Sequence, residues 1–408
     1  MEQIIQLLSS CHFMLKSLSR HLLHLPLLWL AAGIIWFPQG NKPMVAIVLI
    51  VVLFYVFGHG LSDIKRNFQS SYWLGGILIS ALFVTISYKT YGASTQELRG
   101  LLIALVYLSV LPNNFLSWKN AQTLLCVAAM ASFILSIWYF LIVPTDRIHW
   151  PTNPVPLAAH QGLVSLLSLG LLLTSFDGKK PWVLSFSMLL SGFSMLPTQS
   201  RGVIVGVAAV YFLACILLIL QKKISYKNIV FSLVLMLICG ALVKDVLMDR
   251  VNDTFEEVES IKSGNLDTSI GWRLQMYQAG IDLFVQKPIL GHGEISSEYA
   301  EENAPGYTTS AYGYMAGHLH NNYIDKLAKS GFVGFSLLLF ILFYPLYLGV
   351  FKYKNGFWLL ALPSLHFIIF SMVDSPFRNG DTAVLYLIVI GLVIHSLSSV
   401  NQDKRLEP

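Results

Sequence analysis

Long apolar runs separated by short polar segments dominate this chain. Runs such as Met44–Phe57, Gln122–Val143 and Gly202–Leu220 approach or exceed the roughly 20 residues needed to cross about 30 Å of hydrocarbon. The alternating pattern of a β-barrel is absent, and an open sheet would leave its edge groups unsatisfied in lipid. The pattern therefore predicts an all-α membrane protein.

We predict about twelve transmembrane helices and one large loop. The first nine make up residues 1–246, and the N-terminal stretch is expected to be an uncleaved signal anchor with an interfacial helix. Residues 247–330 form the loop, and 331–408 hold the last three spans and a short tail. The twelve spans are expected near 22–38, 43–60, 72–89, 98–114, 119–143, 159–176, 181–197, 202–221, 227–247, 331–351, 355–373 and 382–399.

Composition supports the same class. The chain has 55% hydrophobic and 12% charged residues, which is outside the usual range of soluble domains. Lys and Arg are uneven between the two sides: fourteen fall on the side of the N-terminus, against six on the other side outside the large loop. The positive-inside rule then places both termini in the cytoplasm and the loop outside it. No basic-aromatic array for nucleic acid is present, and no cysteine pair predicts a disulfide.

The loop is the sizeable aqueous segment of the chain. It carries twelve of the 22 acidic residues and no run that could cross a bilayer. Trp272, Met276, Ala279 and Leu283 recur at near-helical spacing, which predicts an amphipathic helix that starts near Gly271 and lies against the bundle. A turn follows at 287–293, and 298–314 should form a mobile lip over a site.

Three arginines are candidate anion ligands. Arg201 lies between two spans on the side where positive charge is disfavoured, so an anionic partner such as phosphate explains it better than snorkelling does. Arg273 should lie at the N-terminus of the loop helix, where free N–H groups add to its attraction for phosphate. Arg250 follows the ninth span, beside Asp249. It could bind an anionic ligand or form an ion pair with a carboxylate of the loop.

Two histidines precede the tenth span in the segment Gly317–Tyr323. Alternation in an extended segment would point His318 and His320 to the same side. An imidazole, with an ordinary pKa near 6.5, is suited to accept a hydroxyl proton. Two ligands are too few for a metal site, so we expect none. Asp374 ends the eleventh span on the same side and could orient a histidine or hold an arginine.

A family resemblance joins several of these residues. His320-Asn321, nine further residues and Gly331-Phe-Val-Gly334 resemble the H-N-x9-G-x-x-G signature of the O-antigen ligase family. The Thr-Gln-Ser-Arg201-Gly segment, and Arg273 with the downstream Pro288-Ile-Leu-Gly-His-Gly293, are similar to the arginine motifs of that family. The resemblance covers roughly Pro197 to Asp374, and O-antigen polymerases share these motifs.

The resemblance implies a function and roles for the site residues. It makes Arg201, Arg250 and Arg273 diphosphate-binding, His320 the catalytic base and Asp374 its support, with His318 and Asn321 as further support. The donor would be an undecaprenyl-diphosphate-linked glycan and the acceptor lipid A–core, in the bacterial inner membrane among membrane lipids, with no cofactor, nucleotide or metal. The rivals are an O-antigen polymerase and, third, a lipid or glycan transporter.

Overall fold

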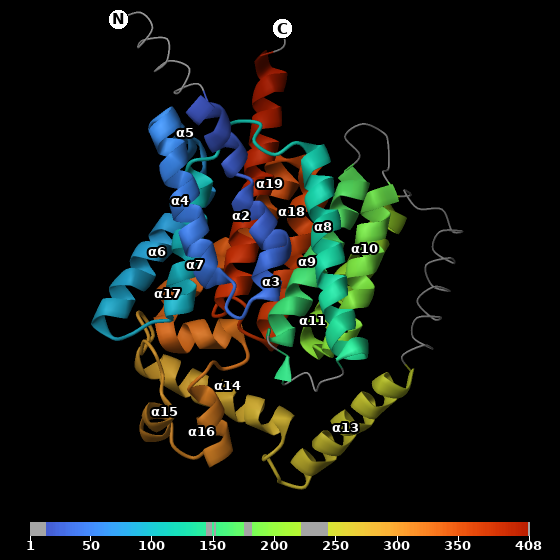
Figure 1. Ribbon diagram of the computed structural model, residues 1–408. Coiled ribbons are helices and arrows are strands. Elements are labelled where there is room, and N and C mark those ends of the chain that lie inside the picture. Colours follow the sequence, from blue (N-terminus) through green and yellow to red (C-terminus); the bar gives the residue numbers. More distant parts are fainter. Residues whose placement is uncertain (1–13, 144–148, 151, 175–181, 222–243, 407–408) are drawn as a thin grey trace, which may run out of the picture.

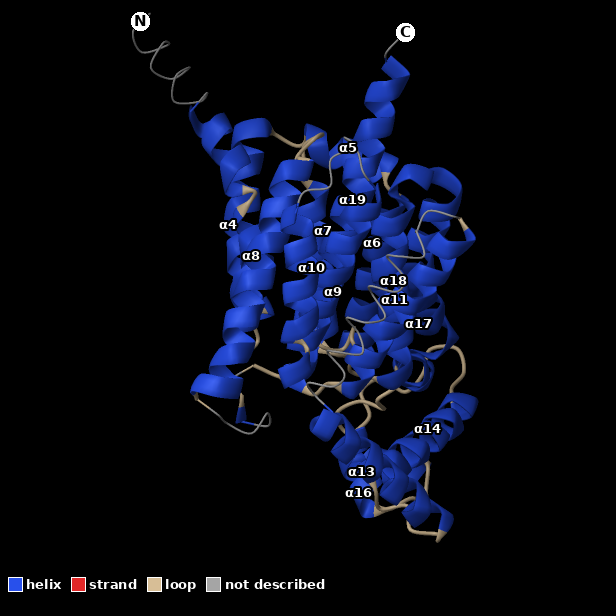
Figure 2. Cartoon of the chain, turned by 90° about the vertical axis from the view of Figure 1, so that its right-hand side faces the viewer, coloured by secondary structure: helices blue, strands red, loops and turns tan. Residues whose placement is uncertain are grey.

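The computed structural model describes residues 14–143, 149–150, 152–174, 182–221 and 244–406. Side chains at 244–247, 249–251 and 401–406 lie outside the description, as does most of the ninth predicted span. Within the described ranges every regular element is a helix, and Figure 2 shows no strand in them. The all-α class predicted from the sequence is therefore confirmed.

The helices follow the apolar runs. After a helical segment from Met14, the elements are α2 (Leu25–Leu28), a π-helical turn (Trp29–Gly33), α3 (Ile34–Trp36), α4 (Asn41–His59), α5 (Ser62–Ser70), α6 (Tyr72–Thr90), α7 (Thr95–Ser109), α8 (Trp118–Ile137), α9 (Pro154–Thr174), α10 (Trp182–Ser194), α11 (Arg201–Leu220), α13 (Lys244–Lys262), α14 (Ser269–Gln286), α15 (Ser297–Asn303), α16 (Thr309–Met315), α17 (Asn322–Tyr347), α18 (Phe357–Val373) and α19 (Gly380–Leu406).

Nine helices in the described ranges are long and apolar enough to cross a membrane. They are Met14–Trp36, Asn41–His59, Tyr72–Thr90, Trp118–Ile142, Pro154–Thr174, Arg201–Leu220, Asn322–Lys352, Lys354–Val373 and Gly380–Val400. The seventh predicted span appears as a shorter apolar helix, Trp182–Thr198. The fourth is α7, whose 15 residues end at Ser109, short of a full crossing.

Burial separates central helices from outer ones. The apolar windows of α9, α18 and α19 are 78%, 72% and 67% buried, whereas that of α4 is 28% buried and those of α8 and α11 are 33% buried. The outer helices expose large side chains such as Phe57, Phe212 and Leu220. Exposed apolar surface of this extent suits contact with lipid.

The four loop helices α13 to α16 lie together at the end of the bundle opposite the last turns of α19 (Figure 1). Met276, Ala279 and Leu283 of α14 are buried with residues of α15, α16 and the start of α17, which gives this part a small core of its own. The predicted amphipathic helix is thus confirmed. Its start at Gly271 was wrong by two residues, because the side chain of Thr268 caps the helix by accepting from Gly271 N–H.

The tenth span begins earlier than hydropathy predicted. α17 starts at Asn322 rather than at 331, and its backbone leaves helical geometry at Gly331, with φ +60° and ψ −163°. The charged residues Asp325, Lys326 and Lys329 lower the hydropathy of its first turns. They are nevertheless buried, because each has an oppositely charged partner.

The 288–293 turn packs against this kink. Phe332 N–H donates to the Pro288 carbonyl at 2.8 Å, and Gly293 N–H to the Lys329 carbonyl at 2.8 Å. A Cβ on Gly331 would overlap the backbone of Ile289, and one on Gly291 would overlap the backbone of Lys329. Glycine is therefore required where the two backbones meet. This contact fixes α14 relative to α17.

Candidate active site

His318, His320 and Asp374 meet at the end of the bundle that carries the loop helices; we call them the histidine–aspartate cluster. His318 Nε2 lies 2.9 Å from Asp374 Oδ1, and His320 Nδ1 lies 3.6 Å from the same oxygen. The two imidazole rings are 4.1 Å apart between centroids. They lie on the same side, as predicted. The extended geometry assumed for this was wrong, since His320 has φ +49°.

Backbone and side-chain contacts hold this turn in place. Asn321 caps α17 by accepting from Tyr323 and Ile324 N–H, and its amide donates to the Met372 carbonyl at 3.1 Å. Tyr277 of α14 donates its hydroxyl to the His320 carbonyl at 3.0 Å. A non-glycine residue in the left-handed region stores backbone strain, which persists only where neighbours enforce it. Contacts from α14, α17 and α18 therefore hold the backbone of His320 in this conformation.

Asp374 stays ionised over the working range of pH. Burial of its carboxyl raises the pKa, but the contacts with His318 and His320 outweigh burial and hold the pKa of Asp374 well below its usual range. The carboxylate also accepts from Ser375 N–H at 2.7 Å. An ionised carboxylate beside an imidazole nitrogen favours the tautomer that carries its proton there.

Arg201, Arg273 and Asp374 line one cavity of about 790 Å³, which we call the arginine pocket. Arg201 is half-exposed and lies 3.5 Å from Asp253. Arg273 is half-buried, and no described residue forms an ion pair with it. The structure thus brings together two of the three predicted arginines and the predicted aspartate.

The side chain of Arg250, the third predicted arginine, lies outside the described residues, although its backbone belongs to α13.

A helix N-terminus opens onto the pocket, but it is not the one expected. The first-turn amides of α14 are occupied: Ile270 N–H donates to Glu257 and Gly271 N–H to Thr268. Arg273 is the fifth residue of that helix, so the predicted help from free N–H groups was wrong. α11 instead begins at Arg201 with no side-chain cap, and its first residues Arg201 to Val203 line the pocket. Arg201 N–H donates to the Gln199 carbonyl at 3.0 Å, so the amides of Gly202 and Val203, together with the helix dipole, are what favours an anion there.

The pocket also contains carboxylates that sequence reasoning did not place there. Asp253, Glu256 and Glu257 of α13 line it together with the arginines. Glu257 accepts from Ile270 N–H, and Asp253 pairs with Arg201. Nothing in the local sequence indicates that α13 packs against α14. An anionic ligand would displace the Arg201–Asp253 contact.

The cluster offers three metal-ligand atoms within 4.8 Å of one another, one from each of His318, His320 and Asp374. The sequence argument counted only the two histidines, because Asp374 lies 56 residues from His318 along the chain. Two histidines and a carboxylate are a set that zinc accepts. Metal independence therefore stays a prediction that needs a direct test.

Tyr277 is a site residue that sequence reasoning missed. It lies one turn beyond Arg273 on α14 and reaches the backbone of His320. Burial raises the pKa of Tyr277, so the phenol stays protonated and donates. The i to i+4 spacing from Arg273 was the available signal, since it puts both residues on the same face.

Comparison with known proteins gives three findings. Residues 186–339 match the family model described as O-antigen ligase. A relative from Escherichia coli named O-antigen ligase is 24% identical over 281 residues, 66% of this chain and 64% of that protein. A relative from Haemophilus influenzae, described as an uncharacterized protein, is 27% identical over 139 residues, 32% of this chain and 35% of that protein.

The chain therefore spans just under two thirds of one relative and about a third of the other. The matched residues include Arg201, Arg273, His318 and His320, while Asp374 lies beyond them. Residues 186–339 relate this chain to the O-antigen ligase family, and the resemblance predicted from its motifs is confirmed.

Proposed function

We propose that this protein transfers a glycan from undecaprenyl diphosphate to a hydroxyl of lipid A–core. The observation that carries the proposal is that Arg201 and Arg273 share a cavity with Asp374, the carboxylate that contacts both histidines. A cationic group for a leaving diphosphate and a base for an incoming hydroxyl are the two requirements of this reaction.

In the proposed reaction the acceptor hydroxyl oxygen bonds to the anomeric carbon of the glycan as the bond from that carbon to the diphosphate oxygen breaks. The bonding electrons leave with the diphosphate, whose growing charge meets Arg201, Arg273 and the uncapped end of α11. The hydroxyl proton passes to an imidazole nitrogen. In-line displacement of this kind would invert the anomeric centre.

Geometry favours His320 as the base. Its Nδ1 lies 3.6 Å from Asp374 Oδ1, so Nε2 is the ring nitrogen that remains for an acceptor hydroxyl. His318 has the opposite arrangement, with Nε2 bonded to Asp374 at 2.9 Å. A carboxylate at Nδ1 and a free Nε2 is the arrangement of a histidine base that a carboxylate orients. The 3.6 Å contact at His320 would tighten when substrates bind.

The proposal includes a location and topology. We propose twelve spans in the bacterial inner membrane, both termini in the cytoplasm and the 247–330 loop in the periplasm, on the basis of the Lys/Arg bias. The three-part division at 246 and 330 belongs to this proposal. The kink at Gly331, where the 288–293 turn docks, supports the second boundary. The reaction would need no nucleotide, cofactor or metal.

The test combines purified full-length protein, undecaprenyl-diphosphate-linked glycan and purified lipid A–core, without nucleotide. The joined glycolipid and an equal amount of undecaprenyl diphosphate should form. Glycan that grows on the carrier lipid while lipid A–core stays unmodified would identify a polymerase instead. Movement of either lipid across vesicles with no bond formed would identify a transporter.

A further inference from the structure

A second polar cavity lies beside the arginine pocket. Its volume is about 310 Å³, which is at the lower end of the range of pockets that hold organic ligands. We call it the amide cavity, because amide side chains dominate its polar lining: Gln39, Asn41, Gln96, Asn153 and Asn379, with Thr152, His160 and Asp381. The site described above uses none of these residues.

The first turn of α9 separates the two cavities. Val155 lines the arginine pocket, whereas Asn153 and Pro156 line the amide cavity. The two cavities are therefore neighbours.

Charge in the amide cavity excludes a phosphate. None of the described residues that line it is Lys or Arg. Its carboxylate, Asp381, accepts from the backbone and side-chain N–H groups of Asn41, both at 2.7 Å. Arg99 donates to the side-chain amide oxygen of Asn41 at 2.6 Å. Asp381 and Asn41 thus satisfy each other, and a cavity lined by amides without a cation suits a neutral ligand with hydroxyl groups.

Two of the residues that line it carry a buried polar atom that has no hydrogen-bond partner among the described residues. Thr152 Oγ1 and His160 Nδ1 belong to side chains 8% and 1% exposed, and neither atom has a partner among the described residues. His160 Nε2 lies 3.1 Å from the Leu30 carbonyl, which holds the ring in place, and Nδ1 has no hydrogen-bond partner in the part of the chain that the structure describes. A buried polar atom without a partner is unfavourable, so a ligand whose hydroxyl groups reach these atoms would gain by pairing with them.

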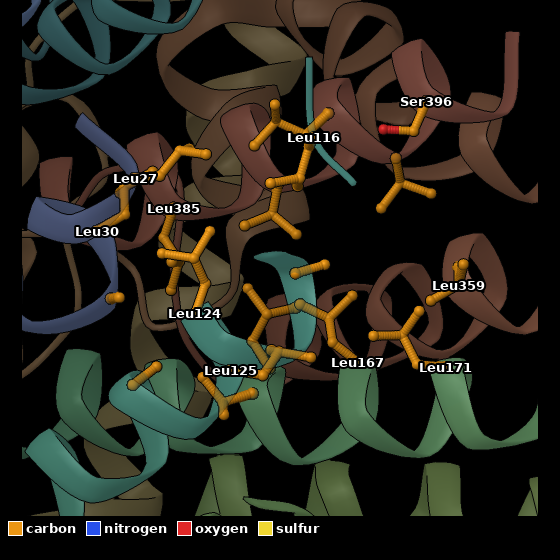
Figure 3. Close-up of a pocket in the computed structure, with 18 of the residues that line it drawn as sticks. Leu27, Leu30, Leu116, Leu124, Leu125, Leu167, Leu171, Leu359, Leu385 and Ser396 are labelled. Atoms are coloured by element: carbon orange, nitrogen blue, oxygen red, sulfur yellow. The ribbon is translucent and has the colours of Figure 1, made fainter. Parts of the chain in front are cut away.

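An apolar cavity adjoins the amide cavity on the side of the bundle interior. His160 and Leu385 line both, and leucines such as Leu124, Leu125 and Leu167 surround the rest (Figure 3). The polar cavity and the apolar cavity thus share the side chains of His160 and Leu385 as their common boundary. This places the amide cavity at the edge of the apolar bundle, where a glycan attached to a membrane lipid would lie.

We propose that the amide cavity binds a sugar residue of a lipid-linked substrate while that substrate occupies the active site. The inference rests on the proposed function. Two substrates supply such a sugar: the acceptor glycan, and the donor glycan beyond the residue that reacts. Thr152 and His160 would pair with its hydroxyl groups and so determine which glycan is accepted.

The test uses two variants of the full-length protein. Thr152→Val removes the unpaired hydroxyl and conserves shape, and Pro38→Trp narrows the cavity from an exposed rim position. Thr174→Val is the matched control, because its hydroxyl bonds to the Gly170 carbonyl at the far end of α9. KM and kcat are measured separately for donor and acceptor.

Thr152→Val should raise one KM about threefold to tenfold, the effect of one hydrogen bond, with kcat retained. Pro38→Trp should raise the same KM, and Thr174→Val neither. A change in the acceptor KM assigns the sugar to the acceptor, and a change in the donor KM assigns it to the donor. A cavity that holds only water would leave both KM values unchanged in both variants, which overturns the proposal.

A second measurement separates failure of this inference from failure of the proposed function. The oligosaccharides released from lipid A–core and from the donor are titrated calorimetrically into wild type, Thr152→Val and Thr174→Val. One of them should bind wild type and the control alike, and Thr152→Val more weakly. This result is expected even if no glycan is joined in the assay. Equal binding to all three proteins, or binding to none, overturns the inference.

Discussion

Two groups of charged residues near the start of α17 differ in their exposure to solvent. The histidine–aspartate cluster is open: the side chains of His318 and His320 are 32% and 26% exposed, beside the arginine pocket. The other group, the ion-pair cluster, is closed: Asp325 and Lys329 are 6% and 7% exposed and 2.8 Å apart, and Lys326 pairs with Glu97. Closed pairs hold the fold, whereas open, half-satisfied groups remain available for chemistry.

The largest expected effect is at His320. His320→Ala should reduce turnover by roughly 10² to 10⁴, as expected for loss of a general base, with donor binding retained. His318→Ala is the control within the cluster and should be much milder, because its Nε2 is already bonded to Asp374. Turnover is measured in the joining assay and folding by thermal denaturation in detergent. Near-normal turnover of His320→Ala would place the base elsewhere, with His318 and then Asp374 as the next residues to test.

The ion-pair cluster should respond first in stability, and in turnover only through the histidine segment that it holds, because Asp325 accepts from Leu319 N–H at 3.1 Å and Lys329 donates to the Gly317 carbonyl at 3.3 Å. Asp325→Ala leaves Lys329 as a buried, uncompensated charge and should destabilise the protein by about 3–5 kcal/mol. Asp325→Leu combined with Lys329→Met removes both charges and should recover most of that stability. If Asp325→Ala kept wild-type stability but lost turnover, the division between the two clusters would be wrong.

Arg273→Ala should cost roughly 10² to 10³ in turnover, the scale seen when one group that stabilises a developing negative charge is removed. Arg273→Lys should recover part of this, since it supplies charge without the bidentate fork. Lys287→Ala, exposed just beyond the other end of α14, is the matched control. Arg201→Ala should behave like Arg273→Ala. Wild-type donor binding in both alanine variants would make the two arginines structural.

The smallest effect is a shift with pH. Because the pKa of Asp374 is lowered, its stabilising charge is present above the ordinary pKa of Asp, about 3.9, and is lost only as pH falls through the lower folded value. Activity lost on acidification above pH 5 should therefore not come from protonation of Asp374. In Asp374→Asn the acid limb of the rate profile should move to lower pH, since the anion that favours imidazolium is gone. An unmoved limb would remove Asp374 from the mechanism.

Hydropathy predicted most of the bundle, since nine described helices are long enough to span and coincide with apolar runs. It misplaced the start of α17 because paired charges such as Lys326 with Glu97 count as polar in sequence, although they are buried. Local motifs identified Arg201, Arg273 and the histidines. The sequence also offered Asp374 as a partner for a histidine or an arginine, but it could not decide between them. The contact of Asp374 with His318, 56 residues away, and the packing of Glu256 into the pocket both arise from tertiary packing.

The central claim is that His320 of the histidine–aspartate cluster acts as a base without a metal ion. It is tested most directly by comparing wild type with His320→Ala in the joining assay. Wild type and His320→Ala are incubated with lipid-linked glycan and lipid A–core in excess EDTA. The amounts of released undecaprenyl diphosphate and of joined glycolipid are then measured. We predict equal amounts of both from wild type in EDTA, and a rate roughly 10² to 10⁴ lower from His320→Ala. Product that disappears in EDTA and returns with a divalent ion would assign His318, His320 and Asp374 to a metal site and contradict this account.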